Sequence, residues 1–252
     1  YMEETLNDLK GYIALGHVRY STTGSSLISN AQPFRVQYSG KSFAVAHNGN
    51  IVNALQIRSE LEDSGSIFQT TMDSEVVLHL IAKSFKSGLE QAMAQTMTQI
   101  RGAYSMVVMT EDGIIAAKDP NGFRPLCIGR LNSGYVVASE TCALDLVEAE
   151  YLREIEPGEI VVINGEGLKS IPSGIESRKS QCIFELIYFA RPDSRVFGQN
   201  VYLFRKRQGE LLAEEFPIDA DLVMPFPDSG NYAAIGYAQA SGIPFEMGVI
   251  RN

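Results

Sequence analysis

The sequence predicts an α+β fold in which antiparallel strands pack with helices, followed by a short parallel α/β unit. Three β-hairpins follow one another between residues 103 and 171. Their turn signals are Asp112-Gly113, Asn132-Ser133-Gly134 and Asn164-Gly165. Two amphipathic helices precede the hairpins. Helices followed by hairpins are typical of an α+β domain and not of a βαβ series.

The N-terminal part predicts a strand over Tyr12–Tyr20 and then a hairpin. Phe34–Tyr38 and Ser42–His47 alternate apolar and polar residues around Ser39-Gly40. From Ile51 onward the apolar residues Ile51, Val52, Leu55 and Leu61 have near-helical spacing, and Asn50 suits the N-cap. The HNGN motif at 47–50 is therefore expected where a strand becomes a helix.

The two helices before the hairpins each have one apolar face. The first is expected to begin near Thr71–Asp73, with Asp73 and Glu75 facing the positive end of the helix dipole. The apolar faces comprise Val76, Val77, Leu80, Ile81 and Phe85 in the first helix and Leu89, Met93, Met97 and Ile100 in the second. The spacing favours core packing over a ligand surface for the methionines.

A domain boundary is expected at 176, because Pro, Gly, Ser and charged residues gather between Ser173 and Lys179. The domains are then 1–176 and 177–252. The second begins with a helix over Arg205–Glu215. It continues as a strand, a Pro-Asp-Ser-Gly loop, a helix and a strand, at Asp221–Phe226, 227–230, Tyr232–Ser241 and Ile243–Ile250. This order starts a parallel α/β unit, in which the strand-to-helix loop is the usual ligand position.

Composition narrows the function classes. The 252 residues carry a net charge of -9, which argues against a nucleic-acid surface. No apolar run approaches the roughly 18 residues of a membrane span, and no signal peptide opens the chain. Three widely spaced cysteines predict neither a disulfide framework nor a self-contained zinc site. We expect a cytoplasmic enzyme. Because Tyr1 is not an initiator Met and an apolar stretch runs almost to Asn252, we expect a piece of a longer protein.

Three motifs between Gly16 and Glu75 suggest one small-molecule site: GHVRYSTTG, HNGN and TMDSE. The Arg19 guanidinium can grip a carboxylate in bidentate fashion, and the Thr22 hydroxyl can add a hydrogen bond. Alone, Arg19 fits a surface ion pair better. Asp73 can receive an ammonium group, although a residue that favours the helix start explains it more simply.

The HNGN motif supports a catalytic role better than Arg19 or Asp73 does alone. The Asn48 amide and the Gly49 N–H can converge on one oxyanion, and Gly49 lets the backbone approach a ligand. A turn that ends in an N-cap explains Gly49 and Asn50 equally well and leaves Asn48 unexplained. Taken together, the motifs describe a free amino acid held at both ends, whose side-chain carbonyl is attacked.

A nucleophile is missing from this set. Cys127 and Cys142 have no nearby His in the sequence and fit buried structural thiols better. His17, His47 and His79 lie in predicted strands or a helix and do not suggest a base.

The chain resembles the amidophosphoribosyltransferase branch of the N-terminal-nucleophile (class II) glutamine amidotransferases, and the resemblance covers practically its whole length. The family-wide signals are GHVRYSTTG, NAQPF, AHNGN and TMDSE, and the more specific ones are KDPNGFRPLCIG, ASETCALD, EIEPGEIV and CIFELIYFARPDS. The resemblance implies a four-layer αββα N-terminal-nucleophile hydrolase sandwich followed by the incomplete start of a phosphoribosyltransferase domain.

The resemblance also implies an activity, a glycosyltransferase reaction that opens de novo purine synthesis. Glutamine would bind through Arg19, Thr22 and Asp73, with Asn48 and Gly49 as the oxyanion hole. The nucleophile would be an N-terminal Cys upstream of Tyr1, whose α-amine acts as the base. The chain as given is then expected to be inactive, because it lacks that Cys.

The resemblance also implies ligands for the second domain. The Asp228-Ser229-Gly230 loop would contact the pyrophosphate of phosphoribosyl pyrophosphate, with Mg²⁺ as counter-ion. Cys182 matches a position that ligates a [4Fe-4S] cluster in some members, although a structural thiol suits this chain better. Purine nucleotide inhibitors and a homo-oligomer, a dimer or tetramer, are implied as well.

Two alternatives stay open. Another class II amidotransferase, of the glucosamine-phosphate synthase type, would carry a different acceptor domain, against which IYFARPDS and the strand–PDSG–helix unit argue. A non-catalytic glutamine-binding module is the alternative from another class, because the nucleophile is missing.

Overall fold

The computed structural model describes residues 10–18 and 27–251 of the chain, which fall into two compact units. The first comprises the chain up to Arg124 together with Ile155–Ser180, and the second comprises Pro125–Glu154 and the chain from Gln181. The second unit therefore contains a segment inserted between two parts of the first. The predicted domain division at 176 stays a prediction.

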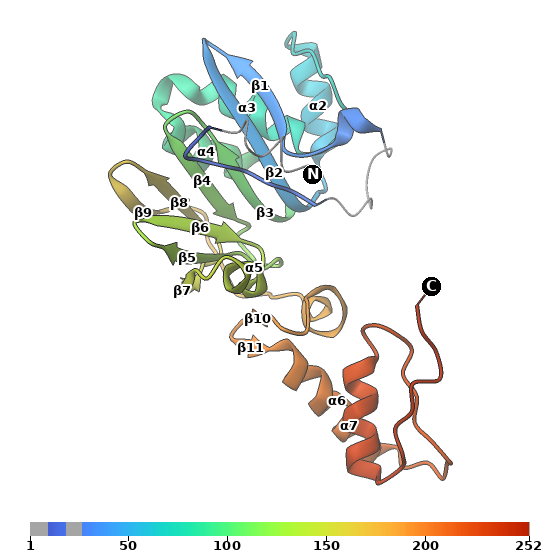
Figure 1. The fold of residues 1–252 in the computed structure, drawn as a ribbon. Helices are drawn as coiled ribbons and strands as arrows, with labels where there is room; N and C mark the ends of the chain where they lie inside the picture. Colours follow the sequence, from blue (N-terminus) through green and yellow to red (C-terminus); the bar gives the residue numbers. More distant parts are fainter. Residues whose placement is uncertain (1–9, 19–26, 252) are drawn as a thin grey trace. The chain divides into compact units, whose positions relative to one another are not determined.

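The first unit is built on a six-stranded sheet in the order β1-β2-β3-β4-β8-β9, with every neighbouring pair antiparallel (Figure 1). The strands are β1 (Phe34–Tyr38), β2 (Lys41–Ile51), β3 (Gly102–Met109), β4 (Gly113–Lys118), β8 (Glu159–Asn164) and β9 (Gly167–Pro172). The helices are α2 (Ala54–Asp63), α3 (Glu75–Ser84) and α4 (Leu89–Gln99), with short 3₁₀ turns η1 (Ile28–Asn30) and η2 (Phe85–Ser87).

One face of this sheet packs against the three helices. Val45, Met106 and Ile115 of the sheet share a core with Val77 and Met93 of the helices, and all are almost fully buried. The predicted apolar faces of α3 and α4 are confirmed, although α3 begins two residues later than Asp73. Antiparallel sheets combined with helices confirm the α+β class and are consistent with an N-terminal-nucleophile hydrolase fold.

The first hairpin forms as predicted. Tyr38 pairs with Lys41, so that Ser39 and Gly40 make a two-residue turn with φ values of 52° and 77°. Positive φ at both central residues is the geometry that matches the right-handed twist of the flanking strands. The later hairpins β3–β4 and β8–β9 also form around their predicted turns.

The prediction that Asn50 caps a helix beginning at Ile51 is wrong. β2 continues through Ile51, and Asn50 and Ile51 pair with Ala103 and Gly102 of β3. Helix α2 begins at Ala54, and two of the four residues predicted for its apolar face, Val52 and Leu55, are 69% and 84% exposed. Pairing with β3 gives the backbone a ladder of hydrogen bonds, and this tertiary contact overrides the local helical spacing.

The predicted strand over Tyr12–Tyr20 does not form over 12–18, the part of it that the structure describes. None of the described strands pairs with these residues, so their apolar alternation has no ladder to join.

The second unit contains a three-stranded antiparallel sheet in the order β6-β5-β7. Its strands are β5 (Cys127–Leu131), β6 (Gly134–Ala138) and β7 (Glu150–Glu154), with α5 (Thr141–Leu146) between the last two. The remaining elements are a π-helical turn η3 (Glu185–Phe189), the pair β10 (Arg195–Val196) and β11 (Gln199–Asn200), and helices α6 (Val201–Glu215) and α7 (Asn231–Ser241). No helix among the described residues is long and apolar enough to cross a membrane.

The two C-terminal strands were predicted too long. Only Val223 and Phe245 form a bridge, which is parallel as expected for an α/β unit. Val223 donates its N–H to Pro244 O at 2.8 Å and accepts from Glu246 N at 3.0 Å. Neighbouring Leu222 and Met224 are 47% and 53% exposed, so little apolar burial supports longer strands among the described residues.

Helices α6 and α7 approach each other so closely that glycine is needed at their crossing. A Cβ on Gly209 would overlap the carbonyl oxygen of Ala233, and one on Gly236 would overlap that of Lys206. Both obstacles are backbone atoms, which cannot move aside as a side-chain end can.

Replacing Gly209 by alanine should therefore weaken this helix pair. Alanine favours an isolated helix over glycine by about 1 kcal/mol, whereas forcing a methyl group into a packed contact costs roughly 1–3 kcal/mol. Because the obstacle here is backbone, the second effect should win, and α7 amides should exchange hydrogen faster. Gly165→Ala is the control, since nothing lies within 4 Å of its Cβ position. Equal protection of α7 in both variants would contradict the prediction.

Candidate functional site

The structure brings Asn48, Gly49 and Asp73 of the predicted site together at the end of β2 that extends beyond its pairing with β1. Asn48 and Gly49 lie in β2, and Asp73 lies two residues before α3. Asp73 reaches β2 directly, because its Oδ2 accepts the backbone N–H of Ile51 at 2.9 Å. Arg19 and Thr22 lie outside the described residues.

Gly49 occupies a position that only glycine suits. Its φ is +147°, and a Cβ there would overlap the carbonyl oxygen of Ala103 on β3. On either side of it, His47 donates its N–H to Gln32 Oε1 at 2.7 Å and Ile51 donates to Asp73. Alternate residues of a strand direct their N–H groups to the same edge. The Gly49 N–H therefore belongs to the edge that faces away from β3.

Asn48 offers the second donor. It pairs with Ser105 of β3 and is half-buried. Its side-chain amide makes no hydrogen bond within the part of the chain that the structure describes. An amide NH₂ has two donors, so Asn48 can serve a ligand without breaking an internal contact.

Asp73 is held by a small polar group on the helix side of β2. Ser74 Oγ lies 3.1 Å from His47 Nδ1 and donates to Asp73 Oδ1 at 3.3 Å. The same His47 nitrogen lies 3.8 Å from Asp73 Oδ2. Burial lowers the pKa of His47, and the Asp73 carboxylate opposes that shift. The ring is thus favoured in its neutral form beside the Asp73 side chain.

Asp73 does not cap the helix that follows it. No side-chain cap is present at the start of α3, and the Asp73 carboxylate turns instead to Ile51. The simpler explanation of Asp73, a residue that favours the helix start, therefore does not account for where its side chain lies.

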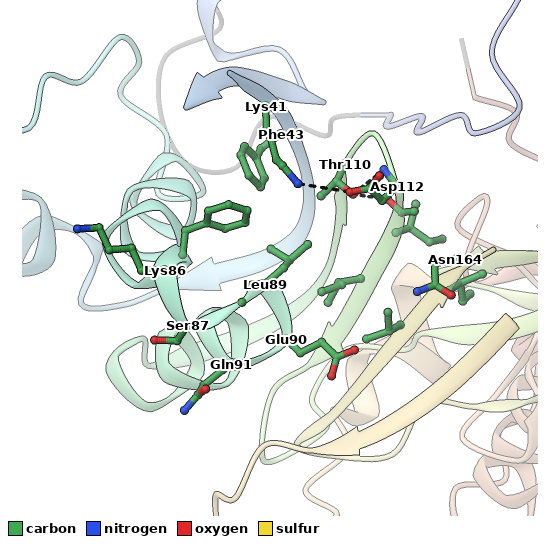
Figure 2. A pocket seen from close by; sticks show the side chains of 17 residues that line it. Lys41, Phe43, Lys86, Ser87, Leu89, Glu90, Gln91, Thr110, Asp112 and Asn164 are labelled. Atoms are coloured by element: carbon green, nitrogen blue, oxygen red, sulfur yellow. Dashed lines mark hydrogen bonds and ion pairs between the residues drawn. The ribbon is translucent and has the colours of Figure 1, made fainter. Parts of the chain in front are cut away.

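A separate cavity of about 660 Å³ opens at the other end of the same sheet (Figure 2). Lys41 and Phe43, at the start of β2, line it together with Phe85 and Leu89. The predicted site residues Asn48 and Gly49 lie toward the opposite end of β2. Asn48, Gly49 and Asp73, the described residues of the predicted glutamine site, do not line this cavity.

The Asp228-Ser229-Gly230 loop lies between the Val223 bridge and α7, at the predicted strand-to-helix position. Asp228 is exposed and lies 3.6 Å from the Arg251 guanidinium. The Gly230 N–H donates to Phe226 O at 3.2 Å. This N–H is thus already engaged within the loop, and its role toward pyrophosphate stays a prediction.

The three cysteines are free thiols. Burial raises the pKa of Cys142, which makes its thiolate unfavourable. Cys182 lies three residues before η3 and is half-buried. Over 10–18 and 27–251 no three His, Cys, Asp or Glu residues gather in a way that could hold a metal ion. The described residues therefore do not form a binding site for a cluster at Cys182.

Comparison with known proteins identifies the family. The sequence profile of the family described as "Glutamine amidotransferase domain" matches residues 17–146, just over half of the chain. The chain belongs to the glutamine amidotransferase family. The matched region contains Asn48, Gly49 and Asp73, so the end of β2 described above lies within the family's shared domain.

Relatives of this glutamine amidotransferase are similar over nearly its whole length. It is 51% identical to amidophosphoribosyltransferase of Bacillus subtilis, covering 98% of this chain and 52% of the relative. It is also 51% identical to amidophosphoribosyltransferase 2, chloroplastic, of Arabidopsis thaliana, covering 100% of this chain and 45% of the relative. The chain thus spans about half the length of these relatives.

A solved structure shows the same fold. Glutamine phosphoribosylpyrophosphate amidotransferase from B. subtilis, complexed with ADP and GMP, matches with a TM-score of 0.88 at 49% identity. The match covers 94% of this chain and 51% of that one. The sequence-based resemblance is confirmed.

Sequence analysis missed the residues that hold Asp73 in place. His47 was set aside as an unconvincing base, and Ser74 was given no role in a site. The signal was present in TMDSE, where two polar residues directly follow Asp73. Only their contacts reveal what they do.

Proposed function

We propose that the intact protein is a glutamine-dependent amidophosphoribosyltransferase. It would convert glutamine, phosphoribosyl pyrophosphate and water to 5-phosphoribosylamine, glutamate and pyrophosphate. One observation carries the glutaminase half of this proposal: Asp73 is bonded to the strand that presents Asn48 and Gly49. The identity of about half of all residues to amidophosphoribosyltransferases supports the choice of acceptor.

In this proposal each residue acts on a different part of glutamine. Arg19 and Thr22 bind the α-carboxylate, and Asp73 binds the α-ammonium group. The thiol of an N-terminal Cys upstream of Tyr1 attacks the side-chain carbonyl carbon, and its α-amine takes the thiol proton. Asn48 and Gly49 donate to the oxyanion that forms. Collapse of this intermediate releases ammonia, and water then frees glutamate from the thioester.

The second half of the reaction belongs to the region that begins with α6 and α7. Ammonia displaces pyrophosphate from phosphoribosyl pyrophosphate there, near the Asp228-Ser229-Gly230 loop. Mg²⁺ would neutralise the pyrophosphate charge. Purine nucleotides would inhibit the enzyme, a proposal supported by the nucleotides that the B. subtilis structure contains.

Three further features belong to the intact protein. We place it in the cytoplasm and expect a homo-oligomer, a dimer or a tetramer. A [4Fe-4S] cluster that includes Cys182 would need its other ligands from outside the described residues. The cluster has no part in the chemical steps above.

The alternatives are less well supported. A glucosamine-phosphate synthase type of enzyme would not share half of its residues with amidophosphoribosyltransferases through the C-terminal part of the chain. A non-catalytic glutamine-binding module would not need an unengaged Asn48 amide beside Gly49.

The test uses the full-length natural protein, supplied with glutamine, phosphoribosyl pyrophosphate and Mg²⁺. We expect glutamate and pyrophosphate to appear in equal amounts. Pyrophosphate release with ammonia in place of glutamine should persist when the glutamine site is blocked. Glutamate release that is indifferent to phosphoribosyl pyrophosphate but stimulated by a hexose phosphate would favour the glucosamine-phosphate synthase type.

Replacing Arg19 or Asp73 tests the two-ended grip on glutamine. Arg19→Gln and Asp73→Asn should each raise the KM for glutamine by roughly 10- to 100-fold, because each removes a charge-assisted hydrogen bond. Asp63→Asn, at the exposed end of α2, is the control and should leave KM unchanged. An unaltered KM in both site variants would show that the two ends are bound elsewhere.

A further inference from the structure

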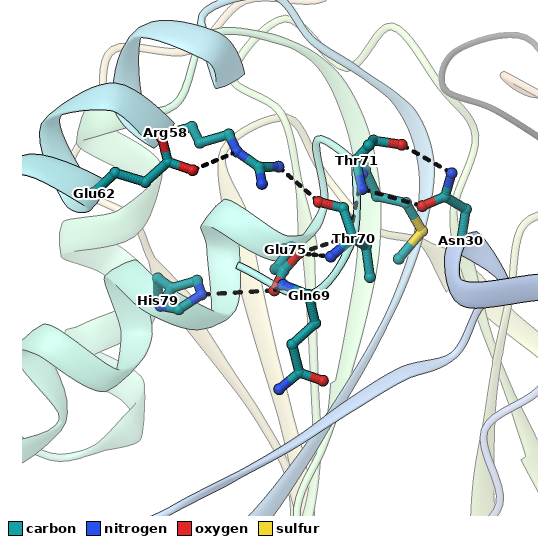
Figure 3. A network of polar contacts seen from close by, with 9 residues as sticks. Asn30, Arg58, Glu62, Gln69, Thr70, Thr71, Glu75 and His79 are labelled. Carbon is teal, nitrogen blue, oxygen red and sulfur yellow. Dashed lines mark hydrogen bonds and ion pairs between the residues drawn. The ribbon is translucent and has the colours of Figure 1, made fainter. Parts of the chain in front are cut away.

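Residues 69–72, which lead up to Asp73, are tied down by side chains from three separate elements (Figure 3). Arg58 of α2 donates to Thr70 O at 2.7 Å. Asn30 of η1 accepts from Thr71 N at 3.1 Å and donates to Thr71 Oγ1 at 2.9 Å. An irregular segment with so many of its backbone groups engaged has little freedom to shift.

Glu75, on the first turn of α3, makes the largest share of these contacts. Its Oε1 accepts the Gln69 N–H at 2.8 Å, and its Oε2 accepts the Thr70 N–H at 2.8 Å and the Thr70 hydroxyl at 2.6 Å. Thr70 Oγ1 in turn accepts the Met72 N–H at 3.1 Å. Glu75 is only 1% exposed. A buried carboxylate with three donors in these positions is strongly held, since hydrogen bonds to a charged group are about twice as strong as neutral ones.

The position of Asp73 depends on this segment. One Asp73 oxygen is committed to the Ile51 N–H of β2, at 2.9 Å. Among the described residues, the other oxygen has a hydrogen-bond contact only with Ser74 Oγ, at 3.3 Å. The direction in which Asp73 presents that second oxygen is set by where residues 69–72 hold its backbone relative to β2.

We infer that Glu75 is a positioning residue for recognition of the substrate α-ammonium group, acting through residues 69–72 on Asp73. The inference rests on the proposed glutaminase function. Glu75 does not contact the substrate. By keeping the Asp73 carboxylate directed at the substrate α-ammonium group, Glu75 favours binding of amino acids over analogues that lack an amino group.

The variant Glu75→Gln separates this role from a general effect on folding. Glutamine has the same size as glutamate but only one acceptor oxygen, and its NH₂ group would face backbone N–H donors at Gln69 or Thr70. The segment should shift while the helix and the core stay intact. Arg58→Ala removes the bond to Thr70 O from a partly exposed side chain and serves as a second variant.

The experiment uses the full-length protein and two ligands. One is glutamine, and the other is 4-carbamoylbutanoate, which is glutamine without its α-amino group and is used as a competitive inhibitor. Glu75→Gln should raise the KM for glutamine about tenfold and leave the inhibition constant of the analogue within about twofold. Arg58→Ala should change the glutamine KM in the same direction by about threefold. Ammonia-dependent pyrophosphate release should be unaffected in both.

Glu62→Gln is the matched control. Glu62 pairs with Arg58 one turn along α2 at 2.9 Å and has no contact with residues 69–72 among the described residues. Glu62→Gln should leave the KM for glutamine and the inhibition constant of the analogue unchanged. Equal increases for glutamine and the analogue in Glu75→Gln, or none for either, would overturn the inference. Wild-type protein without glutaminase activity would instead overturn the proposed function, and the inference with it.

Discussion

Replacing Asn48 by alanine is expected to lower glutamine turnover by roughly 100- to 1000-fold, the usual loss when one side-chain donor of an oxyanion hole is removed. The KM for glutamine should change little, because the amide acts mainly where negative charge develops during the reaction. Ammonia-dependent pyrophosphate release by the same variant should equal that of the wild type. Steady-state kinetics of the full-length protein with each nitrogen donor measures both quantities.

Asn50→Ala is the matched control for Asn48→Ala. Asn50 lies two residues further along β2 and is exposed, and its side chain makes no hydrogen bond within the described part of the chain. It should keep turnover within about threefold of wild type. A comparable loss in both variants would mean that the strand, and not the Asn48 amide, is what the reaction needs.

Gly49→Ala is expected to be strongly destabilising. Two effects act together at this position. A non-glycine residue at this φ of +147° is strained by about 1–3 kcal/mol, and the Cβ overlaps the backbone oxygen of Ala103. Forced overpacking adds roughly 1–3 kcal/mol. The free energy of unfolding should therefore fall by about 2–6 kcal/mol, and much of the protein should be lost to aggregation.

Gly40→Ala separates the two effects. Gly40 also has a positive φ, of +77°, and lies in the turn just before the same strand, but nothing lies within 4 Å of its Cβ position. This variant should lose only about 1–2 kcal/mol, the cost of the backbone conformation alone. Urea unfolding of both variants measures the difference. Equal losses would show that the contact between Gly49 and β3 is not the decisive constraint.

Much of the fold follows from local patterns. The apolar spacing of Val76, Val77, Leu80 and Ile81 placed α3, and the Ser39-Gly40 turn placed the first hairpin. These predictions succeed because periodicity and turn chemistry act within a few residues. Asn50 shows where such reasoning stops. The end of β2 has helical spacing, but residues some fifty positions away on β3 supply the hydrogen bonds that keep it a strand.

The predicted lengths of the two C-terminal strands are wrong because pairing is short there, whereas pairing with β3 lengthens β2. Val223 and Phe245 lie in apolar runs that suit buried strands, and the parallel bridge between them confirms the predicted orientation. A strand extends only as far as a partner pairs with it, and pairing is not encoded in the run itself. The sequence pattern therefore predicted where these strands lie but not their length.

For the site, the sequence by itself determined the residue types: an amide and a glycine in one motif, a carboxylate in another and an arginine in a third. These identities suffice to recognise the family, because the chemistry of binding and attacking glutamine requires them. Only the tertiary structure decided that the Asp73 carboxylate turns to Ile51 of β2 and not to its own helix. Only it showed that Glu75 holds the segment before Asp73. The bond from Ile51 to Asp73 joins segments more than 20 residues apart and depends on how the elements pack. The bonds from Glu75 to Gln69 and Thr70 are closer in sequence, but they depend on how the irregular segment before Asp73 folds back on α3, which no periodic pattern records.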